Sequence, residues 1–363
     1  MLQIVDQGIL SHQSGRGAFM PFITLLADGS FIAAQHIGTG LGAPDNDIEI
    51  LRSADGRAWI SDGQLHDRTN REWAYRGPQI SELPGGGLVM KAGRCQITGG
   101  NLFDPESEGL AHYEMLLLRS SDGGRTWSEP AVVDAGLSRD RYTANDTGTF
   151  LQIAPDRWIY PLETWKPHGW KGPPDQKAAA LFSHDQGTTW GDFTVVADDT
   201  DNRRLWWDQM NCILANGRLY TMFWTHLYGT SDDLNNHWVM SDDEGRTWSE
   251  PRPTNLHGQV CTPIPLADGR VAAIYNYRRE PQGIRVAVTE DLTTFDLERE
   301  VVVFDAGAEA TLGDPESDNF LAEHLQIAFG KPVGVALDGN EIMTAFWCTA
   351  GGVTHTRWVR LRV

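Results

Sequence analysis

Cysteine is scarce in this sequence, which has four among its 363 residues. The four lie far apart and show neither the close spacing of a metal site nor that of a disulfide framework. Each sits in or beside an apolar run of the kind that forms strands: Cys95, Cys212, Cys261 and Cys348. We therefore expect four buried free thiols and, with them, a cytoplasmic protein.

Long apolar runs are also missing. No stretch approaches the roughly 18 apolar residues that span a bilayer, so no membrane partner is expected. The first six residues, MLQIVD, lack the basic and apolar regions of a signal peptide, which agrees with the expected cytoplasmic location.

Basic residues are outnumbered, because 30 Lys and Arg stand against 49 Asp and Glu and give a net charge of −19. Proteins that bind nucleic acid need a basic surface, so nucleic acid is not an expected partner. A strongly acidic surface also repels anions. An anionic substrate would therefore need a local group of arginines.

Patterns of long helices are absent, whereas glycine (38 residues) and tryptophan (14 residues) are abundant, which favours an all-β protein with many turns. The pattern S-x-D-x-G-x-T-W occurs three times, flanked by two shortened copies, at residues 53–59, 120–127, 183–190, 241–248 and 289–295. Ser and Asp side chains can hold the backbone N–H groups of a tight turn, and Gly supplies a positive φ. We interpret these strings as structural turns, not as catalytic groups.

A second repeat, an apolar hairpin with a turn near residues 28, 85, 156, 216, 268 and 338, alternates with the first. Six units of about 60 residues, each with four antiparallel strands, predict a six-bladed β-propeller. No linker-like change of composition divides it, so residues 1–363 are expected to form one domain. The sixth hairpin has no turn string after it, so Gln3 to Leu10 is expected to supply the outer strand of the last blade.

The S-x-D-x-G-x-T-W strings resemble the Asp-box, or BNR, repeat of the sialidase superfamily, and the resemblance covers nearly the whole chain. It implies a glycosidase scaffold whose substrate binds in a central funnel. The remaining loops, opposite the hairpins and turn strings, form the expected functional face. They include residues 61–78 and 305–330 and carry many charged and aromatic side chains, among them His66, Asp67, Arg68, Arg71, Glu323 and His324.

The resemblance also suggests residues for the site. The family's acid/base lies in the first loop of this face, where Asp45 or Asp47 matches it. A glutamate that opens the fourth inner strand in the family is matched by Asp208. An arginine that binds the substrate carboxylate is matched by Arg278.

Three family positions are occupied differently here. The first arginine falls in residues 19–21 (FMP), the second in residues 224–226 (WTH), and the nucleophilic tyrosine in residues 329–332 (FGKP). The resemblance therefore implies a sialidase-shaped scaffold with another specificity, and true sialidase activity is not expected.

The funnel of this chain offers replacements. Arg76, Arg94 and Arg141 are candidates for a rebuilt anion pocket. Glu163 and Asp208, from neighbouring blades, are candidates for an acid/base or acid/nucleophile pair.

Further side chains for sugar binding are Trp165, Trp207 and His257, because sugars stack on aromatic rings and hydrogen-bond to polar groups beside them. We therefore expect an exo-acting glycoside hydrolase that cleaves a terminal, acidic or deoxy, non-sialic sugar by carboxylate acid/base catalysis.

Two alternatives remain open. A lyase that acts on uronates would abstract a proton beside a neutralised carboxylate, and His226, Tyr277 and Arg278 fit that chemistry. A non-catalytic carbohydrate-binding propeller would need only the aromatic side chains of the funnel.

No cofactor is expected, because the 11 histidines form no H-x-x-x-H pair. The run from Asp198 to Asn202 is rich in oxygen ligands and is the candidate for calcium. The sequence leaves the oligomeric state open.

Overall fold

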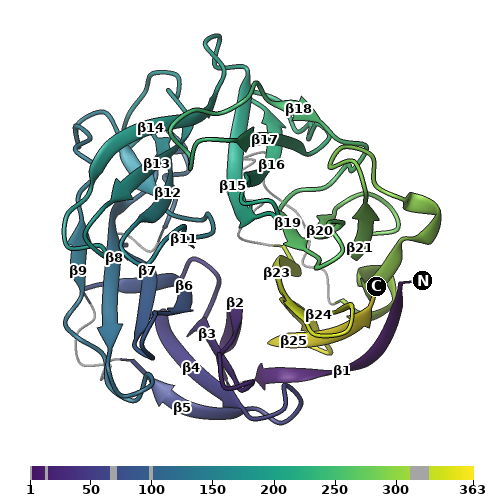
Figure 1. Ribbon diagram of the computed structural model, residues 1–363. Helices are drawn as coiled ribbons and strands as arrows, with labels where there is room; N and C mark the ends of the chain where they lie inside the picture. Colours follow the sequence, from purple (N-terminus) through teal and green to yellow (C-terminus); the bar gives the residue numbers. More distant parts are fainter. Residues whose placement is uncertain (1, 13–14, 66–71, 98–100, 311–326) are drawn as a thin grey trace.

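The computed structural model describes residues 2–12, 15–65, 72–97, 101–310 and 327–363. This part of the chain is an all-β, six-bladed propeller (Figure 1), which confirms the predicted fold. Helix within it is limited to η1 (Leu297–Arg299) and α1 (Ala306–Glu309). Neither is long and apolar enough to cross a membrane.

The first three blades follow one another along the chain, and the strands of each run in sequence order from its inner to its outer edge. Blade 1 contains β2 (Gly17–Leu25), β3 (Phe31–Gly38), β4 (Asp47–Ser53) and β5 (Ile60–Gln64). Blade 2 contains β6 (Ala74–Glu82), β7 (Leu88–Gln96), β8 (His112–Ser120) and β9 (Ala131–Val133). Blade 3 contains β10 (Thr143–Asn145) and β11 (Leu151–Gln152), then β12 (Trp158–Trp165), β13 (Lys177–Ser183) and β14 (Gly191–Asp198).

The other three blades continue the ring. Blade 4 contains β15 (Arg204–Ile213), β16 (Leu219–Leu227), β17 (His237–Ser241) and β18 (Arg252–Pro253). Blade 5 contains β19 (Cys261–Pro265), β20 (Val271–Tyr277), β21 (Gly283–Thr289) and β22 (Val301–Asp305). Blade 6 contains β23 (Phe329–Leu337), β24 (Glu341–Ala350), β25 (Val353–Arg362) and β1 (Gln3–His12).

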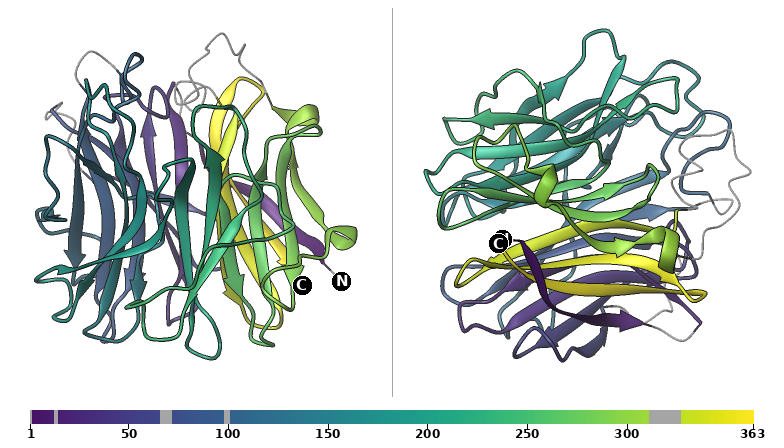
Figure 2. Two further views of the ribbon diagram at one scale, coloured as in Figure 1. Left: turned by 90° about the horizontal axis from the view of Figure 1, so that it is seen from above. Right: turned by 90° about the vertical axis from the view of Figure 1, so that its right-hand side faces the viewer.

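The two ends of the chain close the ring. β1 lies antiparallel to β25, with Gln3 opposite Arg362 and His12 opposite His355. The termini therefore lie side by side (Figures 1 and 2). The N-terminal segment supplies the outer strand of the last blade, as the sequence predicts.

The turn strings are held by their own side chains. In residues 120–127, the Ser120 hydroxyl accepts from Gly124 N at 2.7 Å, and Asp122 Oδ1 accepts from Thr126 N at 2.9 Å. The Trp127 indole donates to Gly124 O at 3.1 Å. The same bonds recur in residues 183–190 and 241–248, except that no equivalent indole bond is found at Trp190. These strings are structural turns that fix each outer hairpin.

The core lies in apolar layers between neighbouring blades rather than in one centre. Large side chains that are almost completely buried include Trp158, Trp165, Trp206 and Trp347. All four cysteines are buried and free, as predicted. Burial raises the pKa of the Cys95 thiol to about 11, so this thiol stays protonated at neutral pH.

Four inner strands share a β-bulge near the funnel. The strand register slips there in β2, β6, β15 and β23. One residue at each bulge has a positive φ: Met20 (49°), Gly77 (52°), Asp208 (50°) and Lys331 (42°). Residues other than glycine rarely adopt a positive φ, and those that do often lie at functional sites. Asp208 and Lys331 are therefore unusual in their backbone as well as in their charge.

Blade 3 differs, because its inner strand is interrupted between β10 and β11. Side chains of neighbouring blades hold residues 146–150 in place of a strand ladder. The Gln79 side chain bonds Phe150 N at 2.8 Å and Phe150 O at 3.0 Å. Asn211 Nδ2 donates to Thr149 O at 2.9 Å.

Candidate active site

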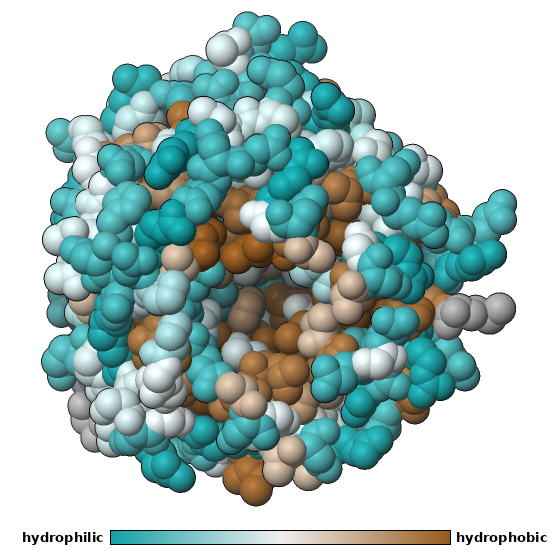
Figure 3. Space-filling model, viewed as in Figure 1, coloured by the Kyte–Doolittle hydropathy of each residue, from teal (hydrophilic) through white to brown (hydrophobic). Residues whose placement is uncertain are grey.

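The centre of the propeller is a hollow whose walls are largely apolar when viewed down the axis (Figure 3). A cavity of about 130 Å³ lies there, and the inner strands of five blades contribute to its wall. Its apolar wall includes four large aromatic side chains: Phe103, Trp207, Trp224 and Trp347. Its polar wall carries the charged residues Arg76, Asp208, Arg278 and Lys331.

Asp208 and Lys331 form an ion pair between blades 4 and 6. Lys331 Nζ lies 2.5 Å from Asp208 Oδ1, and it also donates to Thr147 O at 2.6 Å. The sulfur of Met210 is 3.7 Å from the same nitrogen. The side chain of Asp208 is only 13% exposed and that of Lys331 only 11%. Three acceptors therefore surround the ammonium group of Lys331, and it holds Asp208 in place.

Glu163 is the second carboxylate. It lies on β12 opposite Asn145 of β10 and is completely buried. Thr147 Oγ1 lies 2.8 Å from Glu163 Oε1 and 2.9 Å from Oε2. Asn145 Nδ2 donates to Oε2 at 2.9 Å, and Gln209 N donates to Oε1 at 3.3 Å.

Burial, and next the negative charge of Asp208, raise the pKa of Glu163 to about 8. Glu163 therefore keeps its proton at neutral pH, whereas Asp208 is paired with an ammonium group. Two carboxyl groups in such different surroundings are typical of a proton donor beside an ionised carboxylate.

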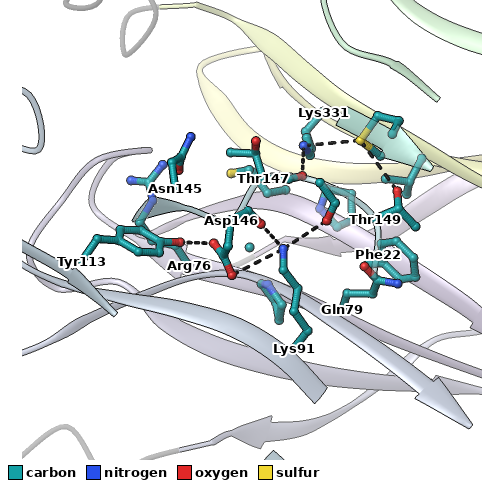
Figure 4. A pocket seen from close by; sticks show the side chains of 17 residues that line it. Phe22, Arg76, Gln79, Lys91, Tyr113, Asn145, Asp146, Thr147, Thr149 and Lys331 are labelled. Atoms are coloured by element: carbon teal, nitrogen blue, oxygen red, sulfur yellow. Dashed lines mark hydrogen bonds and ion pairs between the residues drawn. The ribbon is translucent and has the colours of Figure 1, made fainter. Parts of the chain in front are cut away.

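A smaller chamber of about 40 Å³ adjoins the main cavity, and both share Met20, Arg76, Asn145, Thr147 and Lys331 in their walls. Figure 4 shows this chamber with the labelled side chains that point toward it.

Lys91 and Asp146 form a buried ion pair at this chamber, with Lys91 Nζ 3.4 Å from Asp146 Oδ2. The hydroxyls of Tyr113 and Tyr160 both donate to the carboxylate of Asp146. Lys91 also donates to Gly148 O at 3.1 Å. Burial lowers the pKa of Lys91. This network anchors the interrupted inner strand of blade 3.

Two arginines supply positive charge to the cavity. Arg278 donates to Gln259 Oε1 at 3.0 Å and to Phe329 O at 2.5 Å, and its guanidinium lies 3.9 Å from the centre of the Phe329 ring. Arg76 donates to Leu41 O at 2.9 Å. Burial lowers the pKa of Arg278 to about 9, so it remains charged at neutral pH. No carboxylate of the described residues forms an ion pair with either arginine.

Two polar atoms in the cavity wall have no hydrogen-bond partner among the described residues. They are Asn276 Oδ1 and Trp207 Nε1, and both are buried. Buried polar groups usually have a partner, so both residues are unusual members of the wall, although these two atoms are themselves shielded from solvent.

Several sequence candidates lie away from this cavity. His226 is buried, with Nδ1 3.0 Å from Asp233 Oδ1 and Nε2 3.0 Å from Thr230 O. His257 Nε2 contacts Asp233 O at 2.7 Å. Tyr277 alternates with the lining residues 276 and 278, and its ring packs against the Arg285 guanidinium at 3.8 Å.

Of the three arginines expected from blades 2 and 3, two lie outside the cavity and one lines it. Arg94 pairs with Glu114 at 2.6 Å and stacks on Trp73, outside the cavity. Arg141 pairs with Asp175 at 3.2 Å on the surface. Arg76 is therefore the one residue of the expected rebuilt arginine pocket that lines the cavity.

The two tryptophans proposed for sugar binding also differ. Trp207 lines the cavity, whereas Trp165 is buried behind it with the two ring centres 4.8 Å apart. The Trp165 indole donates to Glu108 O at 2.7 Å. Trp165 therefore supports Trp207 rather than facing a ligand.

Asp45 and Asp47, the acid/base candidates, do not line the cavity. Asp45 pairs with Arg16 at 3.3 Å and accepts from Thr39 N at 3.0 Å. Although partial burial acts in the opposite direction, the hydrogen bonds from Thr39 lower the pKa of Asp45. Asp47 is buried at the start of β4 and accepts from Ile48 N at 2.8 Å.

Some expected loop residues cannot be placed. Six of them lie outside the described residues: His66, Asp67, Arg68, Arg71, Glu323 and His324. Lys331, by contrast, lines the cavity, although it was not predicted from the sequence as a site residue. The sequence indicated only that residues 329–332 lack the tyrosine of the related family. The signal available was the place of Lys331 at the start of the sixth inner strand, equivalent to that of Asp208 in the fourth.

Metal binding has little support in the described ranges, which contain no group of three or more His, Cys, Asp or Glu residues that could hold an ion. In the run proposed for calcium, Asp199 Oδ2 accepts from the backbone N of Arg204 at 3.1 Å and from its Nε at 2.8 Å. Asp199 Oδ1 accepts from Asp201 N at 3.2 Å, so both carboxylate oxygens of Asp199 are already used by the loop itself.

Comparison with known proteins identifies the family. The model of the BNR repeat-like domain matches residues 29–309. The chain belongs to the BNR repeat-like family. A sialidase from Micromonospora viridifaciens is 28% identical to this BNR repeat-like protein over 217 residues, which are 54% of the chain. The matched region covers only 32% of that sialidase.

Solved structures share the fold at low identity. A protein of unknown function from Dyadobacter fermentans has a TM-score of 0.78 at 19% identity, covering 100% of this chain and 99% of the other. An alpha-L-arabinanase from Penicillium chrysogenum, complexed with arabinobiose, has a TM-score of 0.66 at 14% identity, covering 99% and 98%. At these identities the likenesses show the fold, which this chain shares with both proteins.

Proposed function

We propose that this BNR repeat-like protein is an exo-acting glycoside hydrolase that releases a terminal, acidic or deoxy, non-sialic sugar. The observation that carries the proposal is the pair Asp208 and Glu163. One is held by an ammonium group at the cavity wall, and the other is buried and protonated just behind that wall. Glycoside hydrolysis needs a proton donor and an ionised carboxylate.

The surroundings assign a role to each carboxylate. Glu163 is the general acid that protonates the leaving-group oxygen, because it keeps its proton at neutral pH. Asp208 faces the cavity and acts as the nucleophile or as the base for water. Lys331 keeps Asp208 in position and is not a substrate ligand, because its hydrogen-bond donors already have acceptors.

The cavity wall supports a small sugar as the substrate. Its aromatic side chains offer apolar faces for stacking, and the side-chain amide of Asn276 adds a polar group to the wall. Arg278 and Arg76 offer charge for a carboxylate, and the apolar wall suits a deoxy position. The names of the related sialidase and of the similarly folded arabinanase also favour a glycosidase.

The lyase alternative receives less support. Its base would be His226 or Tyr277, and both lie away from the cavity, with His226 bonded on both ring nitrogens. A carbohydrate-binding protein without activity would need only the aromatic wall. The product assay below distinguishes it from an enzyme.

The test is a product assay with wild-type protein and a panel of uronic, rhamnosyl, fucosyl, arabinosyl and sialyl glycosides. Release of reducing sugar, without new ultraviolet absorbance from unsaturated uronate, is the expected result. New absorbance would instead establish a lyase. Binding with no product on any glycoside would establish a carbohydrate-binding propeller.

A further inference from the structure

Glu163 presents a geometric problem for an acid catalyst. Its side chain is completely buried and does not line the cavity. Two side chains lie between its carboxyl group and the cavity, namely those of Asn145 and Thr147. A proton that leaves Glu163 must therefore cross this layer.

The Thr147 hydroxyl is the group placed for that crossing. Thr147 lines both the main cavity and the adjoining chamber (Figure 4). Its Oγ1 lies 2.8 Å and 2.9 Å from the two oxygens of Glu163. A hydroxyl can donate one proton and accept another at the same time, whereas the amide nitrogen of Asn145 can only donate.

The backbone around Thr147 is fixed from three directions. Lys331 Nζ donates to Thr147 O at 2.6 Å. Lys91 Nζ donates to Gly148 O at 3.1 Å, and Thr149 N donates to Gln209 O at 3.2 Å. The interrupted strand of blade 3 therefore holds the hydroxyl at one place between Glu163 and the cavity.

We propose that Thr147 is a catalytic residue whose hydroxyl relays the proton of Glu163 to the glycosidic oxygen of the substrate. The inference rests on the proposed function. The Thr147 O–H bond breaks as its proton goes to the leaving-group oxygen, and a new O–H bond forms with the proton from Glu163. The bond between the leaving-group oxygen and the anomeric carbon breaks in the same step, and that carbon bonds to Asp208 or to the water that Asp208 activates. Thr147 is thereby restored, and Glu163 is left as a carboxylate.

Testing the relay requires a variant of Thr147 that leaves the charged groups around Glu163 unchanged. Asp208 approaches from β15, Lys331 from β23 and Lys91 from β7, and all three act electrostatically on Glu163 or are acted on by it. Thr147→Val removes only the hydroxyl and keeps the shape of the side chain, so these charges remain.

The experiment compares two leaving groups. For a sugar leaving group, which needs protonation, Thr147→Val should lower kcat by about 100-fold or more. For a nitrophenyl leaving group, which departs without a proton, the same variant should stay within a few-fold of wild type. Thr147→Ser keeps a hydroxyl and should keep both rates. Its kcat should also fall at alkaline pH as in wild type, where Glu163 loses its proton.

Thr194→Val is the matched control, because Thr194 lies on the outer strand β14 and its hydroxyl donates to Asp192 O at 3.0 Å, and its rates should equal those of wild type. If Thr147→Val hydrolyses both substrates like wild type while Glu163→Gln loses the sugar leaving group, the relay is wrong and the proposed function stands. If wild-type protein hydrolyses no glycoside, both fall. Thermal unfolding of each variant checks that it is folded.

Discussion

Lys331 of blade 6 and Asp208 of blade 4 meet at a distance of 2.5 Å, although blade 5 separates their strands in the ring. Both residues sit on β-bulges with positive φ, in equivalent places of their inner strands. The pair shows how the propeller builds its central cavity, because side chains from blades that are far apart in the chain meet near the axis. The same geometry leads to specific predictions.

Breaking this pair from one side should be costly. Lys331→Met leaves the Asp208 carboxylate without its cation in a site that is largely shielded from water. We expect a loss of stability of about 3–5 kcal/mol, as for other buried pairs, and a loss of hydrolysis. Lys331→Met combined with Asp208→Asn should recover most of the stability but none of the activity.

A double-mutant cycle measured by urea unfolding checks this coupling. Arg299→Met is the matched control, because its pair with Asp296 is exposed, and it should change stability by less than about 0.5 kcal/mol. Additive effects of the two cavity substitutions would contradict the coupling.

Glu163 should make stability depend on pH. Its pKa is raised from 4.5 to about 8 in the folded protein. Between these values the unfolded chain has released the proton that the folded protein keeps, so a rising pH favours unfolding. The contribution is constant below about pH 4.5 and levels off above about pH 8.

Urea unfolding of wild type and Glu163→Gln from pH 4 to 9 checks this. The stability difference between the two proteins should shift in favour of the variant as pH rises through this window. Glu298→Gln, at an exposed position, should show no such shift. A difference that is independent of pH would mean that Glu163 is ionised in the folded protein.

Asn276 should contribute to binding but not to stability. Its Oδ1 is buried without a partner among the described residues, so Asn276→Ala removes an unsatisfied acceptor and should leave the unfolding temperature equal or higher. Because Asn276 lines the cavity, the same variant should raise KM about 10-fold by removing the side-chain amide from the wall. A lower unfolding temperature with unchanged KM would assign Asn276 a structural role instead.

Arg278 should determine the preference for an acidic sugar. Arg278→Met removes a buried charge that faces the cavity, and binding of a uronate should weaken by at least about 10-fold, as expected for a charge-assisted bond. Binding of the matching neutral sugar should change much less. Calorimetry with both sugars checks this, with Arg279→Met as the control because Arg279 contacts His257 outside the cavity. Equal losses for both sugars would mean that Arg278 only supports the fold.

The fold was predictable because its signals are local. Each turn string, such as residues 120–127, carries the side chains that bond its own backbone. The count of hairpins and strings then predicts the number of blades, and the missing last string predicts that β1 closes the ring. These inferences do not depend on distant contacts.

The site was predictable only in part. Asp208 and Arg278, which line the cavity, were proposed from the family resemblance. Arg76 and Trp207, which also line it, were proposed because they lie in the loops of the expected functional face. Tyr277 is offset from the lining residues Asn276 and Arg278 by strand alternation, because one residue of register decides the face of a strand. Trp165 packs against the lining residue Trp207 instead.

Other features depend on contacts between blades, which sequence spacing does not reveal. The importance of Lys331 follows from its contact with Asp208, 123 residues away. The burial of Glu163 follows from the interruption of the inner strand of blade 3. Arg94 and Arg141 were misplaced because their nearby partners, Glu114 and Asp175, hold them outside the cavity.

The central claim is that Asp208 and Glu163 together cleave a glycosidic bond. The most direct measurement is the rate of sugar release by wild type, Asp208→Asn and Glu163→Gln on the best glycoside of the panel. Asp156→Asn, at an exposed hairpin turn, is the matched control. We predict that both cavity variants lose at least about 100-fold in kcat, while the control equals wild type. Wild-type rates in Asp208→Asn and Glu163→Gln would contradict the claim.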